Sequence, residues 1–203
     1  MTATPTADVD LGDVGEPRPR RVAPFVTLGI AVLIAAMVVV FARAPKGERP
    51  DSAATELLNK LAPPIEGATL DGGRFSLASR RGSWVAVNFF QSTCGPCITE
   101  QPELALFHDA QGSLSLERRT ELVSVVFVDS AENVRSFFAK NGGGNWPVLP
   151  DSNAEISPAY GVAKVPETWI IDPNGLVRKR IIANVTAAGL QGEIDRLRSA
   201  APA

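Results

Sequence analysis

The chain has 203 residues, 45% of them hydrophobic, and a formal net charge of −2 at pH 7. This length allows one sizeable domain and something smaller. The near-neutral charge, with Lys and Arg scattered along the chain, argues against a nucleic-acid-binding protein, because such a protein would favour a basic patch.

The N-terminal region contains two segments of contrasting composition. Residues 1–21 are rich in Pro, Asp and Thr, so we expect a disordered tail that forms no core. Residues 22–42 carry no charge, and as a helix of about 30 Å they match the hydrocarbon core of a bilayer. This pattern favours an uncleaved transmembrane anchor. The "ARA" at 42–44 leaves a cleaved signal peptide as the alternative, whereas the lack of a polar face disfavours a buried helix of a soluble protein.

Basic residues flank the uncharged segment on both sides, so the positive-inside rule does not decide its orientation by count. The tighter cluster precedes the segment and weakly favours a cytoplasmic N-terminus. The flanking residues are Arg18, Arg20 and Arg21 before the segment and Arg43, Lys46 and Arg49 after it. A polar tether is expected over 43–60, followed by a folded domain over 61–203.

The folded part alternates patterns typical of strands and helices. The expected elements are a hairpin over 68–78, buried strands over 84–90 and 121–128, a helix over 96–112, a helix from an N-cap at Ser130, a short helix around 154–161, strands over 166–172 and 176–182 joined by Pro-Asn-Gly, and a final helix over 186–200. This order predicts an α/β domain with a mixed central sheet and helices on both faces.

Both cysteines of the chain, Cys94 and Cys97, lie in "NFFQSTCGPC". A zinc site needs four good ligands, and the chain adds only His108 to the two thiols, so a metal site is disfavoured. A purely structural disulfide is also disfavoured, because two intervening residues close almost no loop and the cross-link stabilises little. The favoured interpretation is thiol–disulfide exchange with another protein.

The expected helix begins beside Cys94, where free N–H groups and the helix dipole favour an anion. Pairs of this spacing lower the thiol pKa from about 8.5 to 7 or below. Cys97, one turn into the helix, is expected to be less exposed and to have a higher pKa. Cys94 would attack a partner disulfide, and Cys97 would then resolve the mixed disulfide. Gly95 would let a partner's backbone approach, and Pro96 suits the first helical turn.

The cysteine pair after a buried strand, followed by "GVAKVPETWIIDPNG", resembles the thioredoxin superfamily. Together with "APPIEGATLDGGRFSLASRRGSWVAVNFF" and "CGPCITEQP", it is similar to the membrane-anchored DsbE/ResA/TlpA group of thiol:disulfide oxidoreductases. The resemblance runs from about Leu61 to Leu197. It implies a thioredoxin-like fold, with Cys94 as the nucleophile and Cys97 as the resolving thiol.

The resemblance also implies roles for residues outside the pair. Pro166 matches the family's cis-proline, which with Val165 lies beside the cysteines and receives substrate peptide as an added strand. Glu100 and Glu167 match carboxylates that make the active site acidic, and one near Cys97 could accept its proton. The residues alone leave open a trans turn proline and solvated surface glutamates.

Two positions depart from what thioredoxins or this group usually carry. Asn88 stands where thioredoxin has a buried Asp, which makes Glu100 the better candidate for proton acceptor. Thr93 stands where the group usually has Trp, so an apolar ring is missing from the face that would dock a partner. Thr93, Gly95 and Pro96 are expected among the residues that contact the substrate.

Members of the group are typically held outside the cytoplasm by an N-terminal anchor. A reductant in that compartment must be reduced again by electrons that cross the membrane. The resemblance implies a membrane thiol-electron transporter as donor and apocytochrome c, through its Cys-x-x-Cys-His haem site, as target during cytochrome c maturation. A general disulfide oxidant, a reductant for copper-centre assembly and a tethered binding module with dispensable thiols are the alternatives. We expect no cofactor, metal or nucleic-acid partner.

Overall fold

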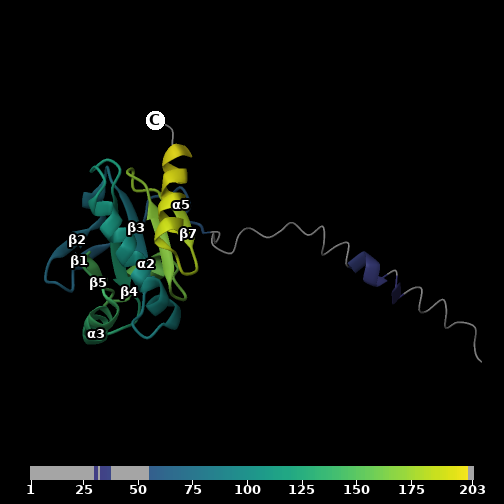
Figure 1. Cartoon of the computed structure of the whole chain (residues 1–203), viewed down its shortest axis with the longest axis horizontal. Coiled ribbons are helices and arrows are strands. Elements are labelled where there is room, and N and C mark those ends of the chain that lie inside the picture. The colour runs from purple at the N-terminus through teal and green to yellow at the C-terminus, as the bar shows by residue number, and fades with distance from the viewer. Residues whose placement is uncertain (1–29, 32, 38–54, 201–203) are drawn as a thin grey trace, which may run out of the picture. The chain divides into compact units, whose positions relative to one another are not determined.

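The computed structural model describes residues 30–31, 33–37 and 55–200. The chain divides into two units, Met1–Gly47 and Glu48–Ala203, which we describe separately (Figure 1). In the first unit, the described residues are helical.

No helix within the described ranges has both the length and the hydrophobicity needed to cross a membrane. The predicted tail over 1–21 and most of the predicted anchor over 22–42 lie outside the described residues, as does the predicted tether up to residue 54. Two residues near the predicted end of the tether pair with strand β7 (Val177–Ile181) and the residue before it: Leu58 forms an isolated β-bridge with Val177, and Leu61 forms one with Leu176.

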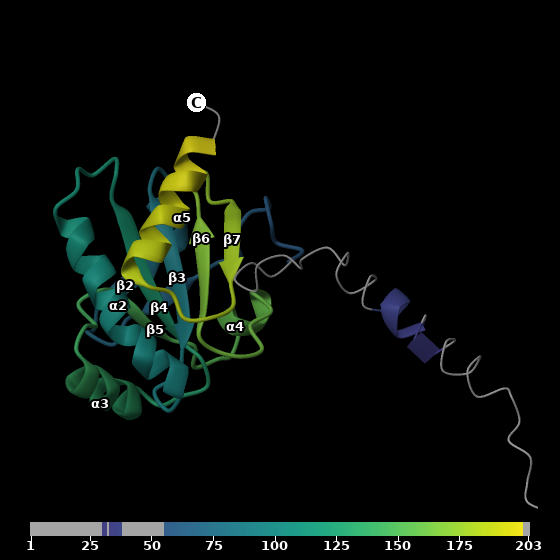
Figure 2. The ribbon, with the colours of Figure 1, turned by 45° about the vertical axis from the view of Figure 1, so that its right-hand side comes forward.

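The folded unit is built on a mixed sheet of five strands in the order β5-β4-β3-β6-β7, which are labelled in Figure 2. The first three are parallel, whereas β6 runs antiparallel to β3 and β7 runs antiparallel to β6. Their bounds are β3 (Trp84–Phe90), β4 (Thr120–Val126), β5 (Val148–Pro150), β6 (Glu167–Ile171) and β7 (Val177–Ile181). The predicted mixed sheet is confirmed. β5 was missed because three residues ending in proline carry too short a pattern to read as a strand.

Helices cover both faces of this sheet, as predicted. One face carries α2 (Gly95–Gly112), α3 (Ala131–Asn141) and α5 (Ala187–Ala200), and Figure 2 shows α2 and α5 side by side. The opposite face packs against the 3-10 helix η1 (Leu77–Arg80), the short helix α4 (Ile156–Ala159) and the hairpin of β1 (Glu66–Ala68) and β2 (Arg74–Ser76). The hairpin predicted over 68–78 therefore begins two residues earlier, at Glu66.

The central strand β3 is buried along its whole length, as its apolar run predicted. Successive side chains point to opposite faces of a sheet. Ala86 and Phe90 pack in the core beneath α2, whereas Val87 and Phe89 pack in the core on the other face. By this alternation Asn88, the polar residue of the strand, faces α2.

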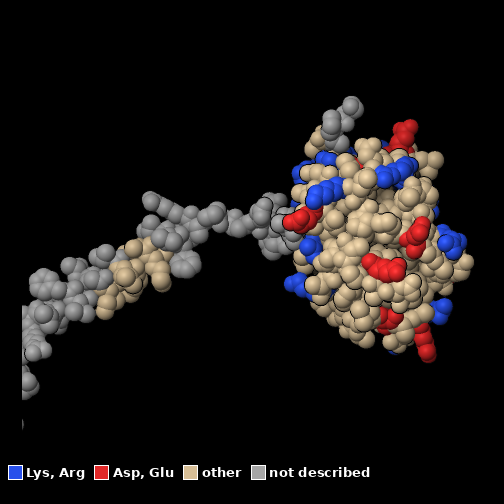
Figure 3. Space-filling view, turned by 180° about the vertical axis from the view of Figure 1, so that it is seen from behind, with Lys and Arg blue, Asp and Glu red and all other residues tan. Residues whose placement is uncertain are grey.

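The surface carries charges of both signs. On the face shown in Figure 3, Lys and Arg side chains are interspersed with Asp and Glu rather than gathered into one patch. This distribution agrees with the near-neutral charge of the chain.

Candidate active site

Cys94 stands where strand β3 gives way to helix α2. The strand ends at Phe90, and Gln91 to Thr93 form the connection. Cys94 has extended backbone angles (φ −78°, ψ 113°) and is the N-cap of α2. Its Sγ accepts a hydrogen bond from the backbone N–H of Cys97, with a sulfur–nitrogen distance of 3.1 Å. The helix therefore begins beside Cys94, as predicted, and directs one of its free N–H groups at the sulfur.

The two cysteines differ in access to solvent. They form a disulfide with their Cα atoms 5.2 Å apart. Cys94 is half-buried, whereas Cys97 is only 3% exposed. A partner's disulfide can therefore approach Cys94 more readily, and Cys97 lies within reach of Cys94 from beneath. This asymmetry is what a nucleophile and a resolving thiol require.

A segment distant in sequence lies against the pair. The Val165–Pro166 peptide bond is cis, as the resemblance implied. The Cys94 Sγ lies 3.5 Å from the carbonyl oxygen of Val165. In the disulfide this is a contact without a proton, and after reduction the Cys94 thiol could donate to that carbonyl. Binding of substrate peptide at Val165 and Pro166 stays a prediction.

The other residues expected to contact substrate surround Cys94 at the surface. Thr93, Gly95 and Pro96 are all exposed. A pocket of about 360 Å³ opens beside them, between the first turn of α2 and helix α3. It is lined by Ser92, Thr93, Ile98, Asn133, Ser136, Phe137, Lys140 and Asn141. Thr93, which is smaller than the Trp usual in the group, therefore lines an open pocket next to the nucleophile Cys94.

Glu100 is buried beneath the pair. It is 1% exposed and follows Cys97 by three residues on α2, a spacing that places two side chains on the same helical face. Its Oε1 accepts a hydrogen bond from the backbone N–H of Val185 at 2.8 Å, and its Oε2 accepts one from Nδ2 of Asn88 at 3.0 Å. The structure therefore rules out the solvated surface glutamate that the sequence left open.

The surroundings of Glu100 change its proton affinity. Burial raises the pKa of this carboxyl from 4.5 to about 7, and the hydrogen bonds from Val185 and Asn88 oppose that rise only in part. A carboxyl with a pKa near neutrality can both take up and release a proton at physiological pH. This is the property needed in a group that accepts the proton of Cys97.

Glu167 is also fully buried, but it points away from the cysteines. In the β3–β6 ladder Glu167 lies opposite Phe89, and Thr168 lies opposite Asn88. Directly opposed residues share a face of the sheet. Glu167 therefore shares the face of Phe89, which is the face that α2 does not cover.

A cation and an indole satisfy the Glu167 carboxylate on that face. Arg180 forms an ion pair with it, and Nε1 of Trp169 donates a hydrogen bond at 3.0 Å. The guanidinium of Arg180 also lies 5.1 Å from the centre of the Trp169 ring. A catalytic role of Glu167 stays a prediction, and this geometry lends it no support.

Several residues that hold the site in place were not recognised in the sequence. The loop before α5 and the first residue of α5 bind α2 in three places: Asn184 donates to the carbonyl oxygen of Pro96 at 2.8 Å, Val185 donates to Glu100, and Ala187 donates to Glu103 at 2.8 Å. These partners are more than 80 residues apart in the chain, so no local pattern could have indicated them.

Asp129 anchors the connection between β3 and α2. Its carboxylate accepts hydrogen bonds from the backbone N–H of Ser92 at 2.7 Å and of Ser130 at 2.8 Å. Ser130 in turn caps α3 as predicted, because its Oγ accepts from the N–H of Asn133 at 3.1 Å. A signal for Asp129 existed in the sequence, since it follows the strand expected over 121–128 and sites in open α/β sheets lie at the carboxyl ends of strands.

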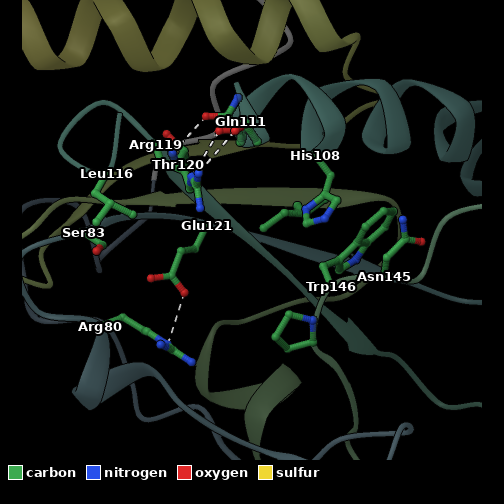
Figure 4. Close-up of a pocket in the computed structure, with 13 residues that line it drawn as sticks. Arg80, Ser83, His108, Gln111, Leu116, Arg119, Thr120, Glu121, Asn145 and Trp146 are labelled. Carbon is green, nitrogen blue, oxygen red and sulfur yellow. Dashed lines mark hydrogen bonds and ion pairs between the residues drawn. The ribbon is translucent and has the colours of Figure 1, made fainter. Parts of the chain in front are cut away.

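His108 lies in a different part of the domain. Its ring packs against Trp146 with 5.2 Å between ring centres, and both line a pocket of about 540 Å³ (Figure 4). Arg80 and Glu121, which form an ion pair there, lie across the pocket (Figure 4). Within the described part of the chain, no three His, Cys, Asp or Glu side chains are grouped so that they could hold a metal ion.

Comparisons with known proteins agree with this site. The profile of the AhpC/TSA family matches residues 58–180. The thiol-disulfide oxidoreductase ResA of Geobacillus thermodenitrificans is 30% identical over 144 residues, which are 70% of this chain and 78% of that protein. The sporulation thiol-disulfide oxidoreductase A of Bacillus subtilis is 30% identical over 125 residues, covering 61% and 73% of the two chains.

A solved structure shows the same fold. The thiol:disulfide interchange protein of the thioredoxin family from Chlorobium tepidum superimposes with a TM-score of 0.60 at 26% identity, over 71% of this chain and 98% of that one. The range matched by the family profile includes the cysteine pair and strand β3, which leads into it. The chain therefore belongs to the AhpC/TSA family, among its thioredoxin-like thiol-disulfide oxidoreductases.

Proposed function

We propose that this protein reduces disulfides of a partner protein outside the cytoplasm, with Cys94 as the nucleophile and Cys97 as the resolving thiol. The observation that carries the proposal is the position of Cys94. It is the more accessible sulfur, it caps helix α2, and it receives the N–H of Cys97. These features favour a thiolate at Cys94 and keep the second thiol buried until a mixed disulfide forms.

The reaction transfers two electrons to the partner. The Cys94 thiolate attacks one sulfur of the partner disulfide, and the other sulfur leaves as a thiolate. The Cys97 thiol then gives its proton to Glu100 and attacks Sγ of Cys94. The bond between Cys94 and the partner breaks, the second partner thiolate leaves, and the Cys94–Cys97 disulfide forms.

The proposed target is the haem-binding Cys-x-x-Cys-His site of apocytochrome c, and the proposed electron donor is a membrane thiol transporter. Support comes from the likeness to thiol-disulfide oxidoreductases named ResA. The uncharged segment over 22–42 is the proposed anchor, which would hold the domain on the side of the membrane where disulfides persist.

Trapping tests the target. In a Cys97→Ala variant the mixed disulfide through Cys94 cannot resolve, so the natural partner should accumulate on the protein and be identified by mass spectrometry. Recovery of apocytochromes c supports the proposal. Recovery of copper-site proteins, or of assorted secreted proteins, would replace the target with one of the alternatives.

Two measurements distinguish a disulfide reductant from a general oxidant and from a binding module. A reduction potential nearer about −270 mV than about −120 mV supports a reductant over a general oxidant. A Cys94→Ser/Cys97→Ser variant should fail to support cytochrome c assembly. Full assembly with this variant would instead establish a binding module in which the thiols are dispensable.

A further inference from the structure

Asn88 places an amide between the sheet and the Glu100 carboxyl. The residue is 1% exposed, and its Nδ2 donates to Oε2 of Glu100 at 3.0 Å and to Oγ1 of Thr168 at 3.3 Å. Its Oδ1 is also buried but has no hydrogen-bond partner within the part of the chain that the structure describes. A buried acceptor without a partner is uncommon and costly, so its presence here calls for an explanation.

Protonation of Glu100 would create a conflict in the present arrangement. Both carboxyl oxygens accept N–H groups, Oε1 from Val185 and Oε2 from Asn88. Both of these partners are donors, so the proton of a neutral Glu100 would find no acceptor between them. The Val185 N–H belongs to the backbone and cannot turn. The Asn88 amide can turn, because half a rotation about its terminal bond exchanges Nδ2 and Oδ1.

We propose that Asn88 is a positioning residue for proton transfer, whose amide donates to the Glu100 carboxylate and, turned by half a rotation, accepts the proton that Glu100 carries on Oε2. This inference rests on the proposed function, in which Glu100 receives the proton of Cys97. It assigns the proton to Oε2, because only the partner of that oxygen can change from donor to acceptor.

The Thr168 hydroxyl can form a hydrogen bond with the Asn88 amide in either orientation of the amide. Its Oγ1 accepts from Nδ2 now, and a hydroxyl can equally donate to Oδ1 after the turn. Each orientation of the amide leaves one of its two ends without a partner. Burial therefore does not strongly favour either orientation, and the protonation state of Glu100 selects between them.

Glu100 is the titratable group that contacts the buried Asn88 amide. On its own helix the other titratable groups are Cys97, when reduced, Glu103, which accepts from Ala187, and His108 and Asp109 more than two turns further along. From β3 and β6 the facing groups are the Asn88 amide and the Thr168 hydroxyl, and the loop before α5 offers a backbone N–H. Among the described residues, no Lys, Arg or His forms an ion pair with Glu100.

Nuclear magnetic resonance of the oxidised wild-type protein tests the turn directly. The carboxyl carbon of Glu100 reports its protonation, and the side-chain NH₂ signals of Asn88 report the environment of Nδ2. We expect both sets of signals to change with the same midpoint. Asn88 signals that stay constant while Glu100 titrates would overturn the proposal, and this measurement requires no variant.

An Asn88→Leu variant tests the consequence for Glu100. It removes both polar ends of the amide at similar volume, so the carboxylate loses a donor that stabilises the charged form. The midpoint of Glu100 should rise by about one pH unit, a tenfold change in proton affinity. Val123→Ala, a core truncation on the neighbouring strand, is the control for lost stability and should leave the midpoint unchanged.

If Asn88→Leu does not fold, Thr168→Val provides the second variant and should shift the midpoint by a smaller amount. In the variant that folds, the pH dependence of Cys97 attack on a trapped mixed disulfide should shift in the same direction as Glu100. An unshifted Glu100 midpoint would overturn the proposal. A shifted midpoint with an unchanged rate profile would instead count against Glu100 as the proton acceptor in the proposed function.

Discussion

Glu100 and Glu167 are both buried, yet they lie on opposite faces of the central sheet. Glu100 extends from α2 to the amide of Asn88, whereas Glu167 forms an ion pair with Arg180 of β7 on the face of the sheet that α2 does not cover. One carboxyl therefore lies beneath the cysteine pair, where no Lys, Arg or His of the described ranges forms an ion pair with it, and the other is held by a guanidinium away from the pair. Substitutions at the two positions should have different consequences.

The stability of the oxidised protein should depend on pH through Glu100. An unfolded glutamate has a pKa near 4.5, whereas burial raises the pKa of Glu100 to about 7. Between these values the folded protein retains a proton that the unfolded chain has released. The free energy of unfolding should therefore fall as the pH rises from 4.5 to 7, by about 3 kcal/mol, and level off above 7.

Glu100→Gln should remove this dependence. Urea unfolding at pH 4.5 and pH 8 should show the loss in the wild-type protein and little change in the variant. Glu103→Gln is the matched control, since it makes the same substitution one turn further along α2 and should keep the wild-type slope. Equal slopes for wild type and Glu100→Gln would contradict the assignment.

Arg180→Met should destabilise the domain without altering the thiols. It leaves the Glu167 carboxylate buried without its cation, which costs about 3 kcal/mol. Arg196→Met, which breaks an ion pair whose arginine is 59% exposed, should cost below about 1 kcal/mol. Urea unfolding measures both. Because Glu167 faces away from Cys94, the alkylation rate of that thiol should not change, and a large change would revive a catalytic role for Glu167.

Cys94 should be the more acidic thiol of the reduced protein. In a Cys97→Ser variant, the rate of alkylation by iodoacetamide should follow a midpoint near pH 7 or below, because the N-terminus of α2 stabilises the thiolate. In the reciprocal Cys94→Ser variant the buried Cys97 should react many-fold more slowly. A Cys94 midpoint above about pH 9 would remove the physical basis for its role as nucleophile.

Asp129 should give the opposite pH dependence to Glu100. Burial raises the pKa of Asp129, but the hydrogen bonds from Ser92, Asn133 and Ser130 outweigh it, so the pKa lies below 3.8. The stabilisation is present above pH 3.8 and is lost as the pH falls through the folded value.

Asp129→Asn should therefore lower the free energy of unfolding at pH 7 by about 1 kcal/mol, and the difference should shrink as the solution is acidified below pH 3.8. Denaturant unfolding over this pH range measures it. Asp109→Asn, at an exposed aspartate of α2, is the control and should have no comparable effect. A deficit for Asp129→Asn that is independent of pH would indicate lost packing instead of lost charge.

The sequence by itself determined the elements whose patterns are local. The apolar run of β3, the cysteine pair at the start of α2, the N-cap Ser130 and the Pro-Asn-Gly turn each involve residues within a few positions of one another, and each is present in the fold. Strand β5 escaped prediction because three residues are too few to display a period.

The tertiary structure alone decided which polar groups meet. Asn88, Glu100 and Val185 come together because the sheet, α2 and the loop before α5 converge, and no spacing in the chain encodes that meeting. The face that Glu167 takes follows from its register against Phe89, and a shift of one residue would have reversed it. Proton affinity depends on burial and on hydrogen-bond partners, so the division of roles between the two carboxyls required the packed structure.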